Sequence, residues 1–428
     1  MSAAQSQTTL KSLQCHFTWD LDRRRSRLLL LRDKMEDIRT EEGNRWLGHI
    51  YNLWGFIQYK LGFNKEAKSL FQKAAETLNQ LRNADEGPWL VVNYGNLAWL
   101  HHHLGDQAES QACLSKVDAL MENYPSPSQD EHHPEIYAEK AWALMFLRGD
   151  MTLVVDYFEK ATRMQPDMVE WNTSYVLALV KNTSLDPDLL EKMRQAKEQD
   201  PENLYLAVLY LKQRADEGEN IRDEVQEIAR WVFGTPVCSY DCVRELFRVY
   251  QKHLGVDKTI VLAEEALRRH PDQRYLKRRA AHSYRNKILQ TRVAHLKPGV
   301  MDKAISLHEE VISLYPHSSL LLVKADLATI HAKSRHSMAR AKQIFQELLE
   351  SDLEPGDKQV LYNKYAKFLN FHLNDLHGSI QYHMNAAAIP EESYFRKDSI
   401  RILEQTKDRD KMCREIEEFL RNLQEPRQ

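Results

Sequence analysis

Small, large and small side chains recur along this chain at intervals of four and then three residues. In the stretch LGFNKEAKSLFQKAAE the pattern consists of Ala67, Phe71 and Ala74. Because residues at this spacing share one face of a helix, the pattern predicts helices that lie very close to their neighbours. Four further triads have the same spacing: Val154, Phe158 and Ala161; Thr259, Ala263 and Ala266; Ala304, His308 and Val311; and Ala341, Phe345 and Leu348.

A proline follows three of these triads by five residues, at Pro166, Pro271 and Pro316. Proline cannot continue a helix, so each one ends a unit and starts the turn into the next. Small side chains where two helices cross, followed by a proline that ends the helix, are typical of the second helix of a tetratricopeptide repeat. Elsewhere apolar residues recur with helical spacing, glycine and proline number only 14 each, and no sustained strand-like alternation occurs. We therefore predict an all-α superhelix of helical hairpins, a solenoid.

The repeats are degenerate, and the clearest insertion lies around 287–301. The predicted organisation is an N-terminal helical cap and loop followed by three groups of repeats, the central one carrying a basic inner face and the last one including a terminal helix. The expected bounds are 1–44 for the cap and loop, then 45–233, 234–317 and 318–428 for the repeats.

Composition excludes several classes of protein. The longest apolar run, LYLAVLYL at 204–211, is far shorter than the roughly 20 residues of a membrane span. The leucine run at 28–31 is flanked by arginines and lacks a cleavage site, so no signal peptide is predicted. Five cysteines without framework spacing indicate the reducing cytosol. The net charge of −3 means that any binding of nucleic acid requires a local concentration of Lys and Arg.

The opening stretch LQCHFTWDL combines residue types that also occur in metal sites. Leu10, Leu13, Phe17 and Leu21 fall on one stripe of a helix, which predicts a helix capping the first repeat. A metal site at Cys15 and His16 is disfavoured, because neighbouring residues on a helix point about 100° apart. Cys238 and Cys242 are spaced i, i+4 and would share one helix face, but two thiols without further partners make a weak metal site, so helix packing is favoured. We interpret the histidines at 101–103 and 132–133 as surface and turn residues. We expect no metal and no cofactor.

Basic residues concentrate in one part of the chain. Between Arg268 and Lys303 there are eleven Lys or Arg and two acids. Arg274, Arg278 and Arg285 fall on one face of a predicted first repeat helix, broadened by Lys277 and Arg279, and Arg244 and Arg248 are spaced i, i+4 on the preceding one. First helices line the concave side of such arrays, so the clustering favours anion binding over a merely solvated face. Arginine suits phosphate because its planar fork reaches two oxygens. Tyr250, Tyr275 and Tyr284 could stack on bases or be part of the core.

Several landmarks occur in the order seen in one protein family. They are LQCHFTW near the N-terminus, NYGNLAWLHHHLG at 93–105, PEIYAEKAWALMFLRGD at 134–150, DPENLYLAVL at 200–209 and KYAKFLNF at 364–371. Through them nearly the whole chain resembles the interferon-induced proteins with tetratricopeptide repeats. The resemblance implies a superhelix whose enclosed basic central channel holds the 5′ end of single-stranded viral RNA, either a triphosphate or an incompletely methylated cap. It also implies sequestration of that RNA and a block of its translation, without catalysis.

The resemblance also suggests roles for individual residues. Trp142 matches a tryptophan that stacks on a cap guanine, although packing is an equally available role. Lys181 matches an arginine on the phosphate bridge, and Phe146 stands where the family has a phosphate-binding lysine. Arg278 and Arg279 replace a His-Gln pair, and the loop of RDKMEDIRTEEGN, with Arg32, Lys34 and Arg39, has no assignable roles. The predicted RNA-binding residues are Trp142, Glu170, Leu177, Lys181, Asn203, Tyr205, Arg244, Arg248, Arg274, Tyr275, Arg278, Arg279 and Arg285.

The predicted function is therefore capture of foreign RNA by its 5′ end in the innate antiviral response, in the cytosol. The implied partner is single-stranded RNA; homo-oligomers, related family members and the translation-initiation machinery are further partners that the resemblance allows, and neither DNA nor a membrane is expected. A protein-interaction scaffold that clamps acidic peptides is the alternative, because such clamps also use Lys, Arg and Asn. No phosphate-binding glycine loop, nucleophile motif or metal-ligand set supports an enzyme.

Overall fold

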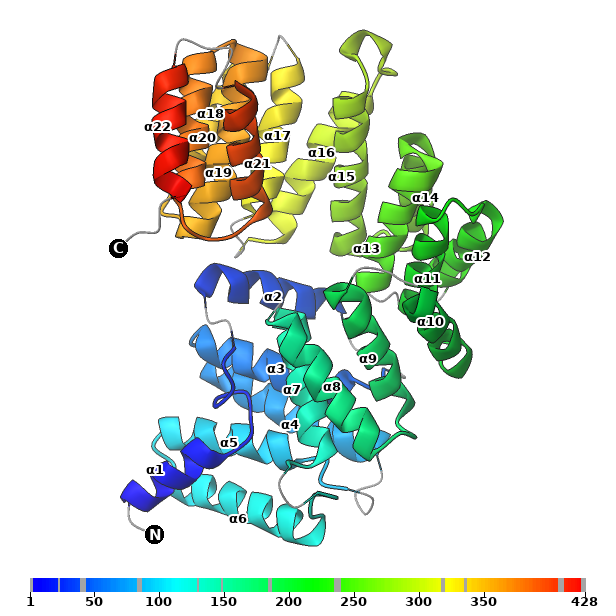
Figure 1. Cartoon of the computed structure of the whole chain (residues 1–428), viewed down its shortest axis with the longest axis vertical. Coiled ribbons are helices and arrows are strands. Elements are labelled where there is room, and N and C mark those ends of the chain that lie inside the picture. The colour runs from blue at the N-terminus through cyan, green and yellow to red at the C-terminus, as the bar shows by residue number, and fades with distance from the viewer. Residues whose placement is uncertain are drawn as a thin grey trace. The chain divides into compact units, whose positions relative to one another are not determined.

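The computed structural model describes residues 3–21, 24–38, 44–82, 87–128, 131–147, 149–183, 187–234, 240–316, 320–334, 337–406 and 412–424. All regular structure in these ranges is helical, and none of it is a strand (Figure 1). Two compact units make up the chain: unit 1 is Met1–Leu254 and unit 2 is Gly255–Gln428. The predicted all-α array of tetratricopeptide-type hairpins is confirmed. The boundary between the units falls inside the predicted central group of repeats.

Unit 1 contains an N-terminal pair of helices followed by hairpins. Successive helices pack as pairs, α3 with α4, α5 with α6 and α7 with α8, and α2 contacts both α3 and α13. The helices are α1 (Ala3–Ser12), α2 (Arg25–Ile38), α3 (Leu47–Lys60), α4 (Asn64–Leu81), α5 (Val91–His103), α6 (Gln107–Asn123), α7 (Pro134–Leu147), α8 (Met151–Met164), α9 (Val169–Asn182), α10 (Pro187–Gln199), α11 (Leu204–Asp216), α12 (Arg222–Gly234) and α13 (Tyr240–Val249), which runs into a π-helical turn, Tyr250–Leu254.

Unit 2 continues the same construction. Each helix from α14 to α18 packs on the next, and α19, α20 and α21 pack on one another. The predicted insertion around 287–301 lies at the junction of α15 and α16 and contains a short 3-10 turn, Val293–His295. The helices are α14 (Val256–Arg269), α15 (Arg274–Gln290), α16 (Val300–Leu314), α17 (Leu321–Lys333), α18 (Met338–Glu350), α19 (Pro355–Phe368) with a π-helical turn at Leu369–Leu373, α20 (Leu376–Ala388), α21 (Tyr394–Thr406) and α22 (Cys413–Gln424).

The predicted small-large-small triads form the inner faces of the second helices. Ala67, Phe71 and Ala74 on α4 are fully buried, as are the equivalent residues of α8. The triads of α14, α16 and α18 are buried as well. Because small side chains stand where helices cross, the large one between them can fill the space between the two helices.

Turns between paired helices depend on glycine. Gly62 follows α3 with φ 94°, and Gly105 follows α5 with φ 81°. In this left-handed region a side chain would be strained, so glycine ends the first helix of a hairpin at low cost. The next helix often begins with a side-chain cap: Asp106 accepts a hydrogen bond from the backbone N–H of Glu109 at 3.2 Å.

The opening stretch corrects one prediction. Helix α1 ends at Ser12, so Leu13–Leu21 is a set of turns and not the helix that the apolar stripe predicted. The Thr18 hydroxyl explains the difference, because it donates to the carbonyl of Leu13 at 2.7 Å and accepts from the N–H of Cys15 at 3.2 Å. Side-chain bonds of this kind replace the helical backbone ladder.

The packing interpretation of the same stretch is confirmed. Leu10, Leu13 and Leu21 are buried, and Cys15 and His16 are fully enclosed. Nδ1 of His16 lies 3.1 Å from the side-chain amide of Asn96, so the ring is held inside the unit by a hydrogen bond.

Two of the other histidines differ from the prediction. His101, on α5, and His133, directly before α7, are buried rather than on the surface. Cys242 is buried in α13, and Cys238 lies outside the described residues. None of the described helices combines the length and the apolar character that crossing a bilayer demands.

Candidate nucleic-acid interface

Lys34 of α2 is held in place by a residue far away in the sequence. Its Nζ lies 2.9 Å from Oδ2 of Asp241, on α13, and the lysine side chain is only 14% exposed. The same ammonium lies over the ring of Phe146, 4.0 Å from the centroid, and 5.1 Å from that of Tyr240. A cation enclosed by a carboxylate and two aromatic faces is fixed in position before any ligand arrives.

Burial and neighbouring charges shift the pKa values of both Lys34 and Asp241. Burial lowers the pKa of Lys34 to about 8, and the positive charges of Arg244 and Lys181 lower it further, while Asp241 opposes them. Burial alone would raise the pKa of Asp241, but Lys34 and Arg244 outweigh it and lower that pKa to about 2. Asp241 therefore offsets only part of the cost of burying the ammonium.

Arginines from α13 extend this positive region. Arg244 contacts Asp241 at 3.0 Å and Glu245 at 3.2 Å, and Arg248 contacts Glu245 at 2.6 Å. Glu245 is buried, whereas the side chain of Arg248 is 60% exposed. We call Lys34, Lys181, Arg244 and Arg248, with Asp241 and Glu245, the unit 1 basic cluster. Within it four cations face two carboxylates, so a net positive charge remains.

Lys181 of α9 completes the cluster beside an aromatic ring. Its Nζ lies 6.0 Å from the ring centroid of Tyr205 on α11. Burial raises the pKa of the Tyr205 phenol, and the charge of Asp241 adds to that effect, so the phenol stays neutral and can donate a hydrogen bond. Lys181 on α9, Tyr205 on α11 and the two arginines on α13 thus lie in one region of unit 1.

Trp142 lies in an aromatic row. Its ring is stacked with that of Trp46 at 5.7 Å and 13°, and with that of Phe146 at 5.3 Å and 26°. The side chain is 8% exposed. Trp142 therefore has a packing role, and it also adjoins Phe146, the ring over which Lys34 lies.

Three other predicted residues have well-defined partners. Glu170 accepts from Arg82 at 2.9 Å and pairs with Arg45 at 3.5 Å. Leu177 packs in an apolar cluster with Met193 and Leu206. Asn203 caps α11, because its Oδ1 accepts from the N–H of Leu206 at 3.1 Å.

The remaining predicted residues lie on α15 of unit 2. The guanidinium groups of Arg274 and Arg278 lie 4.3 and 5.8 Å from the ring centroid of Tyr315. That of Arg279 lies 5.3 Å from the centroid of Tyr275, which is buried. Arg285 pairs with Asp326 at 3.2 Å, a carboxylate that Lys364 also contacts. Arg274 and Arg278 thus share one helix face, as predicted, and unit 2 has its own set of oriented arginines.

The aromatic residues offered for base stacking have different surroundings. Tyr250 and Tyr275 are buried, and the hydroxyl of Tyr284 donates to Glu264 at 2.9 Å. Packing therefore accounts for the first two rings.

Sequence reasoning named Lys34 without a role and did not single out Asp241 or Glu245. One local signal was available: Lys34 stands three residues after Leu31 and six after Leu28, on the side of α2 that is buried. A charge on an apolar helix face requires a partner, although the pattern alone does not say which one. The expected loop is helical up to Ile38, so Arg32 lies on α2 with Lys34 and pairs with Asp33 at 3.3 Å. Arg39 lies outside the described residues.

Comparison with known proteins agrees with this architecture. A family model for the tetratricopeptide repeat matches residues 46–123. Human interferon-induced protein with tetratricopeptide repeats 2 is 28% identical over 90% of this chain and 84% of its own length. Human protein IFIT1 homolog B is 27% identical over 92% of this chain and 87% of its own length. The resemblance drawn from the ordered landmarks is confirmed.

Solved structures give the same fold. A monomeric mutant of IFIT1 with Gppp-AAAA has a TM-score of 0.71 at 23% identity, covering 98% of this chain and 95% of that one. The human IFIT1 dimer with PPP-AAAA has a TM-score of 0.69 at 24% identity over the same shares of the two chains. The whole array of helices is therefore shared.

Proposed function

We propose that this chain, a homologue of the interferon-induced proteins with tetratricopeptide repeats, captures single-stranded RNA by its 5′ end through the unit 1 basic cluster. The RNA would be viral, carrying a triphosphate or an incompletely methylated cap. Its capture in the cytosol would withhold it from translation as part of the interferon-induced antiviral response. Binding, rather than chemistry, is the proposed action.

The observation that carries the proposal is the unit 1 basic cluster itself. Lys34 and Lys181 come from α2 and α9, and the two arginines come from α13. Phosphate oxygens accept strong charge-assisted hydrogen bonds from such groups, and these contacts carry no sequence information. A receptor that recognises an RNA end of any sequence needs contacts of this kind.

Lys34 would take over a role that Phe146 cannot perform. The resemblance predicts a phosphate-binding lysine at position 146, where this chain has an aromatic ring. Because the ammonium of Lys34 lies over that ring at 4.0 Å, a cation adjoins the position after all. We infer that Lys34 contacts the 5′ phosphates, with Asp241 setting its orientation.

Related proteins support the choice of ligand. The IFIT1 structures hold PPP-AAAA and Gppp-AAAA, which are short single-stranded RNAs with phosphates at one end. Trp142 and Tyr205 adjoin the cluster and would border the first nucleotides. Arg274 and Arg278 of α15 are further candidates for phosphate contacts in unit 2.

The direct test replaces both arginines of α13. We expect the double substitution Arg244→Glu and Arg248→Glu to weaken binding of a 5′-triphosphate RNA by at least a hundredfold, roughly the loss of two charge-assisted contacts. Fluorescence polarisation with triphosphate, capped and monophosphate oligonucleotides measures the loss and the end preference together. Arg194→Glu is the matched control, because Arg194 lies exposed on α10 and pairs with Glu191 and Glu198.

Two results would contradict the proposal. One is unchanged RNA affinity in the double variant when circular dichroism shows the native helix content. The other is binding of an acidic peptide in preference to RNA, with a shallow dependence on salt, which would identify a peptide-clamping scaffold.

A further inference from the structure

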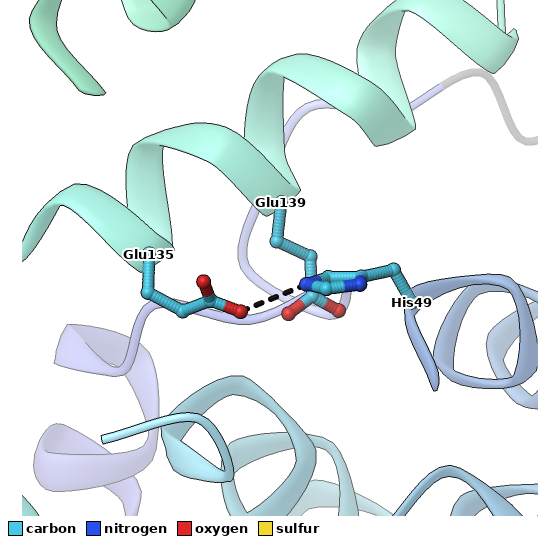
Figure 2. Close-up of side chains that lie close together, drawn as sticks. All are labelled: His49, Glu135 and Glu139. Carbon is cyan, nitrogen blue, oxygen red and sulfur yellow. Dashed lines mark hydrogen bonds and ion pairs between the residues drawn. The ribbon is translucent and has the colours of Figure 1, made fainter. Parts of the chain in front are cut away.

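A second group of polar side chains lies inside unit 1, apart from the basic cluster. His49 on α3 and Glu135 and Glu139 on α7 are all fully buried. One ligand-type atom from each lies within 4.8 Å of the others, and no other group of three or more such side chains in the described ranges has this spacing. Figure 2 shows both carboxylates approaching the imidazole ring. Glu135 and Glu139 are one helical turn apart, so α7 presents them side by side.

Neighbouring residues hold this group in a fixed geometry. Nε2 of His49 lies 2.8 Å from Oε1 of Glu135. The side-chain amide of Asn52 donates to Oε1 of Glu139 at 2.9 Å, and Asn93 donates to Asn52 at 2.8 Å. Outer contacts that orient carboxylates in this way are typical of metal sites.

The bonding of the group is incomplete. Nδ1 of His49, Oε2 of Glu135 and Oε2 of Glu139 are buried and have no hydrogen-bond partner. Buried polar atoms are nearly always paired, and an isolated unpaired one costs about 1–3 kcal/mol. Two such carboxylate oxygens beside one imidazole point to a single missing partner that accepts electron pairs from several atoms, which is the property of a cation.

Charge balance leads to the same conclusion. The group holds two carboxylates and one imidazole, and all three side chains are fully buried. Arg82 acts on the group from outside, but its guanidinium donates to Glu170 at 2.9 Å. Two carboxylates with one neutral imidazole would neutralise a divalent ion.

We propose that His49, Glu135 and Glu139 bind one divalent cation of the zinc class. An imidazole nitrogen with two carboxylate oxygens suits zinc, whereas magnesium and calcium take six or more oxygen ligands, most of which this site lacks. The second oxygens of the carboxylates or a water molecule supply the fourth position.

Binding requires only a small rearrangement. Zinc bonds of about 2.0–2.1 Å place tetrahedral ligands about 3.3 Å apart, between the 2.8 Å of the His49 contact and the 4.8 Å limit of the group. The proton shared by His49 and Glu135 leaves as the ion enters. Because all three side chains are fully buried, no substrate reaches the ion, which acts as a structural link between α3 and α7.

The test measures zinc in the purified full-length chain, produced in zinc-supplemented medium and dialysed before elemental analysis by mass spectrometry. We expect about one zinc per chain, and a fall of at least tenfold in Glu139→Gln, the size of loss typical at metal sites. Glutamine keeps the shape and can still accept from Asn52, so this variant should fold. A chelator should lower the melting temperature of the original chain by several degrees and leave that of the variant unchanged.

Matched variants separate this site from surface binding. His103→Gln changes an exposed histidine in the run at 101–103 and should retain zinc, while His49→Gln should lose it. A chain without zinc after zinc-supplemented production and after refolding in excess zinc would overturn the proposal. So would full zinc content in Glu139→Gln, or a loss in His103→Gln alone. RNA affinity is measured separately, because this site shares no residue with the proposed RNA contacts.

Discussion

At the scale of single residues, Lys34 of unit 1 combines a positive charge with burial. Most lysines are solvated and stay charged well above neutral pH. Here burial and two neighbouring cations lower the pKa to about 8, so the charge that would hold phosphate is present at neutral pH and is lost just above it. A bound phosphate would reverse this effect, because it stabilises the charged form.

This residue predicts a pH dependence of RNA binding. Raising the pH from 7 to 9.5 removes the proton from Lys34 in the free protein, so affinity for triphosphate RNA should fall by about tenfold, the worth of one charge-assisted contact. In Lys34→Arg the guanidinium keeps its charge throughout, and the profile should be flat over this range. Binding isotherms at constant ionic strength measure both. A similar decline in the arginine variant would rule out Lys34 as the titrating group.

At the scale of helices, the distance between the two helices of a hairpin affects the stability of the unit. Gly55 on α3 faces Phe71 of α4, and a methyl group added there would lie 2.7 Å from the ring. Phe71 is fully buried and cannot move aside. The close approach of α3 and α4 therefore depends on a residue without a side chain, as the small members of the triads do elsewhere.

Gly55→Ala should therefore destabilise unit 1 although alanine favours helix. We expect a loss of about 1–3 kcal/mol from overpacking, larger than the gain of up to about 1 kcal/mol in helix propensity. The matched control is Gly234→Ala at the end of α12, where a methyl group meets nothing within 4 Å. Urea denaturation measures both variants. Equal stabilities would show that α3 and α4 separate easily.

Local patterns explain why the helices were predictable and the sites only partly so. The triad of Ala67, Phe71 and Ala74 is set by spacing within one helix, so its burial follows from the sequence. The turns after Ser12 depend on one hydroxyl, that of Thr18, which competes with the backbone. The contact of Lys34 with Asp241 spans 207 residues, and that of His49 with Glu135 spans 86. No local pattern carries such pairings, because they arise only when hairpins stack.

At the scale of the whole molecule, charge is organised locally. The chain has a net charge of −3, yet cations gather around α13 in unit 1, where Lys34 and Lys181 join its two arginines, and on α15 of unit 2. Long-range attraction of RNA would therefore be weak, and the proposed affinity would come from contacts made at short range. Each contact between a cation and a phosphate releases counterions from the RNA. Its contribution to affinity can therefore be measured from how affinity changes with salt concentration.

Salt titration distinguishes the contribution of each unit. Arg244→Gln in unit 1 and Arg278→Gln in unit 2 should each reduce the slope of log affinity against log salt by about one, and the double variant by about two. Fluorescence polarisation between low and moderate salt gives the slopes. A slope unaffected by Arg278→Gln would confine the RNA contacts to unit 1.

The link between Lys34 and Asp241 also has a consequence for biosynthesis. The ribosome makes the lysine 207 positions before the carboxylate that faces it. Chains begin to fold from the N-terminus as they emerge from the ribosome, so α2 emerges long before α13 has been synthesised. A nascent or prematurely terminated polypeptide consequently lacks the proposed phosphate-binding arrangement, and RNA binding of the proposed kind would begin only when translation of unit 1 has finished.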